Sequence, residues 1–239
     1  MKDHMPDAIP APEVVTVPIA GSEATFPVRH VYCVGRNYAE HTKEMGGDTK
    51  EPPFFFTKPA SAVVPVVPPA TGEIAYPLAT KSLHHELELV VAIGKAGVRV
   101  APEDAEGHIF GYAVGLDMTR RDLQGQMKDK RWPWDIGKSF AQAAPISPIH
   151  PIAATGFLTK GSIWLDVNGT RRQQGDLSDM IWDVAHTLHF LSKYYELLPG
   201  DLVFTGTPAG VAAVVPGDRL RGGVDGVDEL SIVIVPPRW

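Results

Sequence analysis

Two glutamates separated by one leucine, Glu86-Leu87-Glu88, are the first candidates for chemistry. They lie in His84–Ile93, which alternates and then becomes continuously apolar, as expected of a strand entering a core. On a strand, both glutamates project from one face, about 7 Å apart. Buried carboxylates repel unless a cation lies between them, and oxygen ligands suit Mg²⁺ or Mn²⁺. The alternative is an edge strand with a hydrated acidic face.

Asp117 offers a third carboxylate. It follows the apolar segment Ile109–Leu116, where the chain turns into a helix predicted over Thr119–Lys128. Ligand-binding side chains collect at strand ends, so three carboxylates would form half of an oxygen shell and leave positions for water or substrate. On local sequence alone, a helix N-cap explains Asp117 equally well.

His41 and Glu44 are three residues apart in Arg36–Met45, which has the composition of a short helix and ends at Gly46-Gly47. A carboxylate beside an imidazole raises its basicity and fixes its tautomer, which suits a general base near neutral pH. A solvated helix face with an incidental pair is the alternative.

Lys138 stands between apolar neighbours in Asp135–Phe140, so it either extends its ammonium to solvent or is held in a site to neutralise an oxyanion. Thr205-Gly206-Thr207-Pro208 follows a predicted strand and offers N–H and hydroxyl donors for a carboxylate, unless it is a plain turn. Further candidates for substrate binding are Arg36, Arg121, Gln124 and Thr207.

Short strands dominate the predicted elements. Asn168-Gly169 predicts a hairpin between Ser162–Val167 and Arg171–Gln174. The one clear amphipathic helix is predicted from Leu177 to Tyr195. Pro65 confines the strand Ala62–Val67 to an edge or makes this segment a loop. The remaining strands are predicted over Val14–Val17, Thr25–Val28, His30–Val34, Phe54–Thr57, Asp201–Thr205, Asp218–Arg221 and Glu229–Val235. The pattern favours an α+β, mainly β architecture with an antiparallel or mixed sheet.

Composition restricts the class of protein. The 239 residues include 23 glycines and 22 prolines, too many turn formers for a long-helix or coiled-coil protein. The formal charge of −6 argues against nucleic acid as a partner. One cysteine, Cys33, excludes an intrachain disulfide and indicates a reducing, cytoplasmic compartment. No signal-peptide pattern or membrane-length apolar stretch is present, so we expect no membrane association.

Seven blocks of the chain, taken in order, resemble the fumarylacetoacetate hydrolase family. The blocks are CVGRNYAEHTKEMG at 33–46, FFTKPASAVVP at 55–65, HHELELVVAIGK at 84–95, GYAVGLDMTRRDLQ at 111–124, PWDIGKSFAQAAPISP at 133–148, LDVNGTRRQQG at 165–175 and DLVFTGTPAGV at 201–211. The length resembles the single-domain fumarylpyruvate hydrolase and acylpyruvase branch. On this basis we expect an N-terminal arm with short strands at residues 1–28 and a catalytic domain at residues 29–239.

The resemblance implies a rolled mixed β-sheet, a homodimer and one Mg²⁺ or Mn²⁺ per subunit held by Glu86, Glu88 and Asp117. It further implies that His41 and Glu44 activate water and that Lys138 acts on the developing oxyanion. By the same resemblance, Arg36, Arg121, Gln124 and Thr207 line the substrate pocket. CVGRNY lacks the additional aspartate ligand that the two-domain tyrosine-catabolic enzyme has, so three protein ligands are expected.

The expected reaction is hydrolysis of a C–C bond in a 2,4-dioxo acid, specifically of fumarylpyruvate to fumarate and pyruvate in gentisate-type aromatic degradation. Hydroxide would attack C4, and the metal would stabilise the pyruvate enolate released when C3–C4 breaks. Arg36 and the basic segment Lys128–Arg131 are candidates for binding a second substrate carboxylate. The alternatives are an acylpyruvase or oxaloacetate decarboxylase with the same site, an isomerase or decarboxylase of the homoprotocatechuate branch, and a non-catalytic binding protein with a structural cation.

Overall fold

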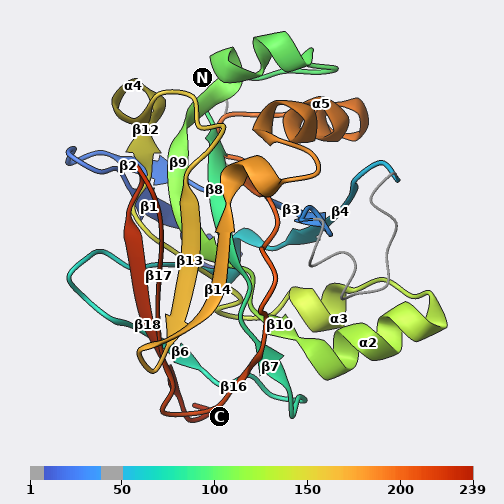
Figure 1. Cartoon of the computed structure of the whole chain (residues 1–239), viewed down its shortest axis with the longest axis vertical. Helices are drawn as coiled ribbons and strands as arrows, with labels where there is room; N and C mark the ends of the chain where they lie inside the picture. The colour runs from blue at the N-terminus through green and yellow to red at the C-terminus, as the bar shows by residue number, and fades with distance from the viewer. Residues whose placement is uncertain (1–7, 39–50, 239) are drawn as a thin grey trace.

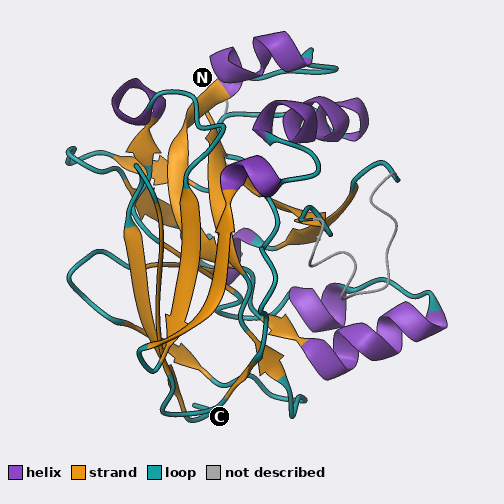
Figure 2. Ribbon diagram, in the orientation of Figure 1, coloured by secondary structure: helices purple, strands orange, loops and turns teal. Residues whose placement is uncertain are grey.

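Strands make up most of the regular structure, and the helices are few and short (Figure 2). The computed structural model describes residues 8–38 and 51–238. Its architecture is mainly β with a curled sheet, as the sequence predicted, and Figure 1 shows the helices around the margins of the strands. Within the described part of the chain, no helix combines the length and apolar character that crossing a membrane requires.

The largest sheet has eight strands and mixed pairing. Its strands follow the order β4-β3-β15-β8-β9-β11-β5, and β12 also pairs with β9. Their bounds are β3 Val31–Gly35, β4 Phe54–Lys58, β5 Val63–Pro65, β8 Leu87–Ile93, β9 Ile109–Leu116, β11 Ala144–Ile146, β12 His150–Pro151 and β15 Leu202–Phe204. The pairs β15–β3 and β11–β5 are parallel, and the other pairs are antiparallel. Because β5 lies at the edge of the sheet, it tolerates Pro65 as predicted.

A five-stranded sheet has the order β14-β13-β17-β18-β6. Its strands are β6 Gly72–Ala75, β13 Ser162–Val167, β14 Thr170–Asp176, β17 Arg219–Val224 and β18 Glu229–Val235. The predicted hairpin turn is confirmed, because Asn168 and Gly169 have φ angles of 52° and 77° between β13 and β14. Two small sheets complete the strands: β1 Thr16–Pro18 with β2 Thr25–Pro27, and β7 Leu83–His84 with β10 Thr119–Arg120 and β16 Ala213–Val214.

The helices of the described residues cover the ends and margins of the sheets. The α-helices are α2 Arg121–Lys130, α3 Asp135–Lys138, α4 Ile152–Thr155 and α5 Val184–Tyr194. Three 3₁₀ turns are η1 Ala60–Ala62, η2 Pro102–His108 and η3 Leu177–Asp179. The helix predicted over Arg36–Met45 is wrong at its start, because Arg36 has a φ of 61° and Tyr38 forms an antiparallel bridge with Met180. The rest of that prediction, at residues 39–45, lies outside the described residues.

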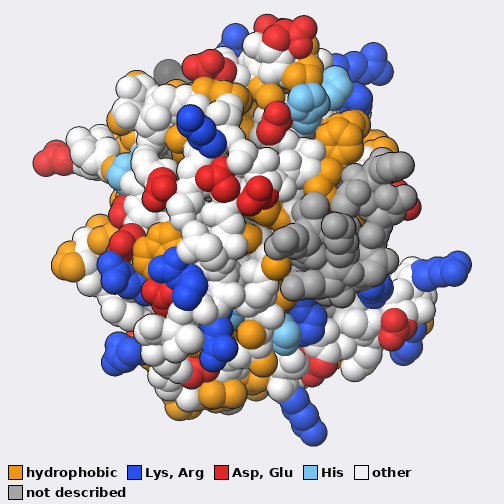
Figure 3. All heavy atoms as spheres, in the orientation of Figure 1, with side chains coloured by type: hydrophobic (Ala, Val, Ile, Leu, Met, Phe, Trp, Pro, Cys, Tyr) orange, Lys and Arg blue, Asp and Glu red, His pale blue; other side chains and the backbone are white. Residues whose placement is uncertain are grey.

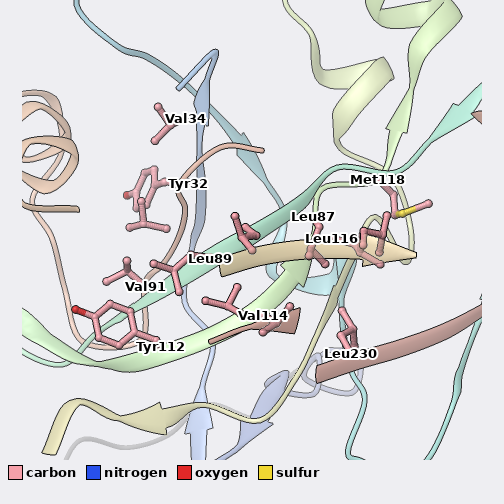
Figure 4. Packing of buried hydrophobic residues seen from close by; sticks show 14 of the residues in the cluster. Tyr32, Val34, Leu87, Leu89, Val91, Tyr112, Val114, Leu116, Met118 and Leu230 are labelled. Carbon is pink, nitrogen blue, oxygen red and sulfur yellow. The ribbon is translucent and has the colours of Figure 1, made fainter. Parts of the chain in front are cut away.

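Strand β8 is buried on both faces, which explains its continuously apolar run. Leu87, Leu89 and Val91 pack in the main hydrophobic cluster with side chains of β9 and the five-stranded sheet (Figure 4). Val90 and Ala92 point the other way, into a second cluster that includes the β1–β2 hairpin. Since side chains alternate along a strand, Glu88 shares the face of Val90 and Ala92.

Several predicted elements have different limits in the structure, and three of them bear on the site and the helices. The strand predicted over His84–Ile93 is divided, because His84 pairs with Thr119 and Ala213 in a separate small sheet before β8 begins. The helix predicted from Thr119 begins at Arg121 instead. The long helix predicted from Leu177 begins only at Val184, because the Asp183 carboxylate caps it by accepting the His186 N–H at 2.8 Å.

Candidate metal centre and active site

Glu86, Glu88 and Asp117 converge as the sequence predicted. One carboxylate oxygen from each lies within 4.8 Å of the others, and all three residues are buried. Strands β8 and β9 are antiparallel neighbours in which Glu88 pairs with Gly115, so the start of one strand meets the end of the other. The Asp117 N–H also donates to the Glu86 carbonyl at 2.8 Å. The hydrated acidic face considered for Glu86 and Glu88 is therefore wrong.

Asp117 is not a helix cap. Helix α2 begins at Arg121 with Arg120 as its N-cap, and Asp117 lies before the intervening strand β10. Its side chain is 1% exposed and lies beside two buried ammonium groups. The position of Asp117 is therefore explained by its contacts in the carboxylate cluster and not by a role as a helix N-cap.

Three cationic side chains surround the carboxylates. The Lys138 ammonium lies 2.8 Å from Glu86 Oε2 and 2.6 Å from Asp117 Oδ2, and it donates to Thr119 Oγ1 at 2.7 Å. The Lys58 ammonium lies 2.7 Å from Asp117 Oδ1, and Arg121 pairs with Glu86. Lys138 is 2% exposed, so it does not extend to solvent. Three positive groups thus balance three negative ones in a space that excludes most water.

The pKa shifts follow from this crowding. Burial lowers the pKa of Lys138, but Asp117 and Glu86 outweigh that effect and raise the pKa above its ordinary value. Burial raises the pKa of Glu88 well above its ordinary value, and Asp117 and Glu86 raise it further. The Gly206 N–H, which donates to Glu88 Oε2 at 2.7 Å, and Lys138 act in the opposite direction.

The donor set fits a hard divalent cation. All three side chains offer carboxylate oxygens, and Mg²⁺ and Mn²⁺ prefer oxygen ligands. A dication beside Glu88 would also offset the repulsion that Asp117 and Glu86 exert on it. The residues present therefore match the cofactor predicted from the sequence.

The loop after β15 forms one wall of the site and is more than a plain turn. Thr205 donates both its N–H and its hydroxyl to the Leu89 carbonyl, at 3.1 and 2.9 Å. Thr207 donates its hydroxyl to the Leu87 carbonyl at 2.7 Å. Gly206 has a φ of 99°, and a Cβ there would lie 2.7 Å from the Cβ of Asn37. A glycine is therefore needed where the backbone approaches Glu88.

A small cavity of about 30 Å³ opens beside the carboxylates, enough for one or two water-sized groups. Seven of the predicted site residues line it: Arg36, Glu86, Glu88, Arg121, Gln124, Lys138 and Thr207. Arg121 donates to the Gln124 side chain, which orients both groups on α2. Arg36 has a φ of 61°, and its guanidinium lies 5.7 Å from the ring centre of Phe54.

His41 and Glu44 lie outside the described residues. The chain leading to them is fixed by Asn37, whose side chain donates to the carbonyls of Trp182 and Thr205 at 2.8 and 2.7 Å. The Trp182 N–H donates back to Asn37 Oδ1 at 2.8 Å. Asn37 therefore joins the segment after β3 to the loop that contacts Glu88.

Several polar residues at the site were not singled out from the sequence, among them Lys58 and Gln173. Lys58 is buried at the end of β4, where a lysine two residues after three phenylalanines was the available signal. Gln173 is fully buried on β14. Its side-chain amide donates to Thr207 Oγ1 at 2.7 Å and the Pro208 carbonyl at 2.8 Å, and it accepts the Leu87 N–H at 3.2 Å.

Comparison with known proteins defines the class. The profile of the fumarylacetoacetate (FAA) hydrolase C-terminal domain matches residues 30–235, so this chain belongs to the fumarylacetoacetate hydrolase family. The chain is similar to the fumarylpyruvate hydrolase of a Ralstonia species, with 45% identity over 186 residues that cover 78% of this chain and 94% of that protein. It is 40% identical to the mitochondrial oxaloacetate decarboxylase of Dictyostelium discoideum over 200 residues, 84% of this chain and 90% of that protein.

A solved structure matches the fold closely. The fumarylpyruvate hydrolase of Pseudomonas aeruginosa, in complex with Mn²⁺ and pyruvate, is 54% identical and superposes with a TM-score of 0.94. The match covers 96% of this chain and 100% of that chain. The family and the fold class predicted from the sequence are thus confirmed.

Proposed function

We propose that this protein is a fumarylpyruvate hydrolase that uses Mg²⁺ or Mn²⁺ to cleave fumarylpyruvate into fumarate and pyruvate. The observation that carries the proposal is the buried Glu86–Glu88–Asp117 cluster with Lys138 beside it. The support from comparison is the 54% identity to a fumarylpyruvate hydrolase crystallised with Mn²⁺ and pyruvate.

The proposed roles follow from where the side chains lie. A divalent cation held by Glu86, Glu88 and Asp117 would supply Lewis acidity toward the substrate oxygens. Arg121 and Gln124, on one turn of α2, would bind the substrate carboxylate that enters their cavity. Lys138 would place its ammonium against the oxygen on which negative charge develops.

His41 and Glu44 would generate the nucleophile. In this proposal His41 takes a proton from water, and Glu44 orients the imidazole and stabilises its charged form. The hydroxide adds to C4, the C3–C4 bond breaks, and its electron pair moves to C3. Protonation at C3 gives pyruvate, and the C4 side leaves as fumarate. One water is consumed, so the reaction is a hydrolysis without a redox step.

A substrate comparison tests the proposal. Purified protein with Mg²⁺ or Mn²⁺ is assayed on fumarylpyruvate, acetylpyruvate and oxaloacetate, and kcat/KM is expected to be highest for fumarylpyruvate. EDTA should abolish the activity, and added Mn²⁺ should restore it. A clear preference for oxaloacetate would contradict the assignment.

Oxaloacetate decarboxylation is the second candidate function. The observation that favours it is the 40% identity to an oxaloacetate decarboxylase over 84% of this chain. The same buried carboxylates and Lys138 would serve either reaction, because both develop negative charge on a pyruvate fragment. Only the oxaloacetate assay releases CO₂, so gas release at a rate above that of fumarylpyruvate cleavage would select this candidate.

The cellular setting is proposed as well. We infer that the protein acts as a cytoplasmic homodimer in aromatic catabolism, on small dioxo acids and not on nucleic acid or membranes. The net charge of −6 argues against nucleic acid as a partner, and Figure 3 shows acidic side chains among the basic ones on the face drawn. The single cysteine, Cys33, is buried, and burial raises the pKa of its thiol, so it is suited to packing rather than nucleophilic chemistry. Light scattering of the purified protein tests the dimer.

A further inference from the structure

A second and larger cavity, of about 540 Å³, adjoins the cavity beside the carboxylates. The two share Arg36, Phe56 and Trp134 in their walls, so they lie on either side of these side chains. The small cavity holds only one or two water-sized groups, which leaves no room there for the rest of a dioxo acid. The larger cavity is therefore the space next to the reacting atoms into which a substrate can extend.

The walls of the larger cavity are aromatic and mutually packed. Phe54 and Phe56 of β4 lie with their ring centres 5.1 and 5.9 Å from that of Trp134, and the Phe54 contact is edge to face. Trp132 and Tyr195 add further rings. Flat aromatic walls suit a planar conjugated chain.

One cation from the basic segment at the end of α2 lines this cavity, and it is Arg131. Lys130 does not line the cavity, although its ammonium lies 4.5 Å from the ring centre of Trp132, which does. Arg131 has a φ of 57°, so the helix ends in a left-handed residue and the chain turns directly into Trp132 and Trp134. Within residues 8–38 and 51–238, no carboxylate pairs with Arg131, although Asp135 lines the same cavity.

We propose that the larger cavity receives the acyl arm of the 2,4-dioxo acid and that Arg131 binds the carboxylate at the far end of that arm. This inference rests on the proposed function and names the residue that selects substrates with a second carboxylate. The aromatic walls hold the planar C=C segment, and the guanidinium offers two parallel N–H donors to the terminal carboxylate. Arg131 is thus a specificity-determining residue outside the metal centre.

The test compares two substrates in four proteins: wild type, Arg131→Gln, Arg131→Lys and Arg219→Gln. Fumarylpyruvate has the terminal carboxylate, and acetylpyruvate lacks it. Arg219 is an exposed arginine that lines a separate cavity on the five-stranded sheet, so its variant is a control for the same change in charge.

Arg131→Gln is expected to lower kcat/KM for fumarylpyruvate about tenfold or more, mainly through KM, because a hydrogen bond to a charged group is lost. The kcat/KM for acetylpyruvate should change by less than about twofold. Arg131→Lys should recover part of the loss, and Arg219→Gln should behave as wild type with both substrates.

An equal fall with both substrates, or no fall with fumarylpyruvate, would overturn the role of Arg131. These results are distinct from failure of the proposed function, in which wild-type protein would not cleave fumarylpyruvate at all. In that case, calorimetric titration of the Mn²⁺-loaded wild-type and Arg131→Gln proteins with fumarylpyruvate still decides the subsite. Weaker binding to the variant would support the subsite, and equal binding would overturn it.

Discussion

The ammonium of Lys58 lies 2.7 Å from Asp117 Oδ1, and both side chains are almost completely buried. Lys58 also donates to the carbonyls of Met118 and Lys138, at 3.2 and 2.5 Å. One side chain thus connects the end of β4 to the segment after β9 and to α3. Because Lys138 itself contacts Asp117 and Glu86, Lys58 positions two of the groups that form the site.

Replacing Lys58 with methionine should destabilise the protein. The variant nearly keeps the volume of the side chain but removes one of the two ammonium groups beside Asp117 and leaves two carbonyls without their Lys58 donor. Breaking a buried ion pair from one side costs about 3–5 kcal/mol, and we expect a loss of about 3 kcal/mol in the free energy of unfolding by urea. Lys95→Met, at an exposed position, should change it by less than about 0.5 kcal/mol. Equal stability of the two variants would show that the Lys58 contacts contribute little.

Glu88→Gln should weaken metal binding. The substitution preserves shape and the acceptor oxygen for the Gly206 N–H but removes the negative charge. Loss of residues that only orient metal ligands costs about 10–100-fold in affinity, so removing a charged ligand should cost more than about 100-fold. Titration with Mn²⁺ followed by calorimetry measures this. Glu73→Gln, an exposed glutamate paired with Arg238, should bind Mn²⁺ as wild type does. Unchanged affinity in Glu88→Gln would remove Glu88 from the ligand set.

His41→Ala separates catalysis from metal binding. If His41 is the general base, turnover of fumarylpyruvate should fall about 10²-fold or more, while the affinity for Mn²⁺ stays near normal. His189→Ala is a matched control. His189 lies on α5, and its Nδ1 contacts the Val100 carbonyl at 2.7 Å rather than any of the three carboxylates. Full activity in His41→Ala would exclude the proposed base, and a parallel loss of Mn²⁺ affinity would mean that His41 supports the metal centre instead.

Many of the strands and turns could be predicted from the sequence, because buried strands have apolar runs and tight turns need particular residues. The apolar run of β9 and the Asn168-Gly169 turn reappear with the predicted limits, since each depends on local chemistry. The start of the amphipathic helix is less predictable. Leu177 and Ile181 fit the apolar spacing, but the helix begins only at Val184, after the Asp183 cap, and its end at Tyr194 is within one residue of the prediction. Periodicity alone does not reveal where a cap begins a helix.

The residues of the candidate site likewise include some that the sequence predicted and some that it did not. Glu86, Glu88 and Asp117 were candidates because acidic residues flank apolar strands, but local sequence left a hydrated face and a helix N-cap open, and the family resemblance is what joined the three residues into one site. Lys58 was not, since a lysine after a short strand is ordinarily exposed, and only the fold brings Asp117 to it. Gln173 stands in a polar run beside Gln174, and nothing local distinguishes the two. The register of β14 on β13, which pairs Gln173 with Leu165, turns Gln173 inward.

Gln173→Leu should therefore destabilise the protein and also slow catalysis. The buried amide donates to Thr207 Oγ1 and the Pro208 carbonyl and accepts the Leu87 N–H, and leucine would remove all three hydrogen bonds, although Thr207 would keep its own bond to the Leu87 carbonyl. Each unsatisfied buried group costs about 1–3 kcal/mol, so we expect a loss of about 3 kcal/mol in the free energy of unfolding.

The catalytic effect in Gln173→Leu should come through the loop. Because Thr207 adjoins Gly206, whose N–H binds Glu88, loosening that loop should lower kcat/KM about tenfold even where the variant is fully folded. Gln174→Leu is the matched control. Gln174 is exposed and contacts Ser162 and Arg171 at the surface, so it should change stability by less than about 0.5 kcal/mol. If Gln173→Leu lost stability but kept full kcat/KM in its folded state, Gln173 would support the fold without positioning the loop against Glu88.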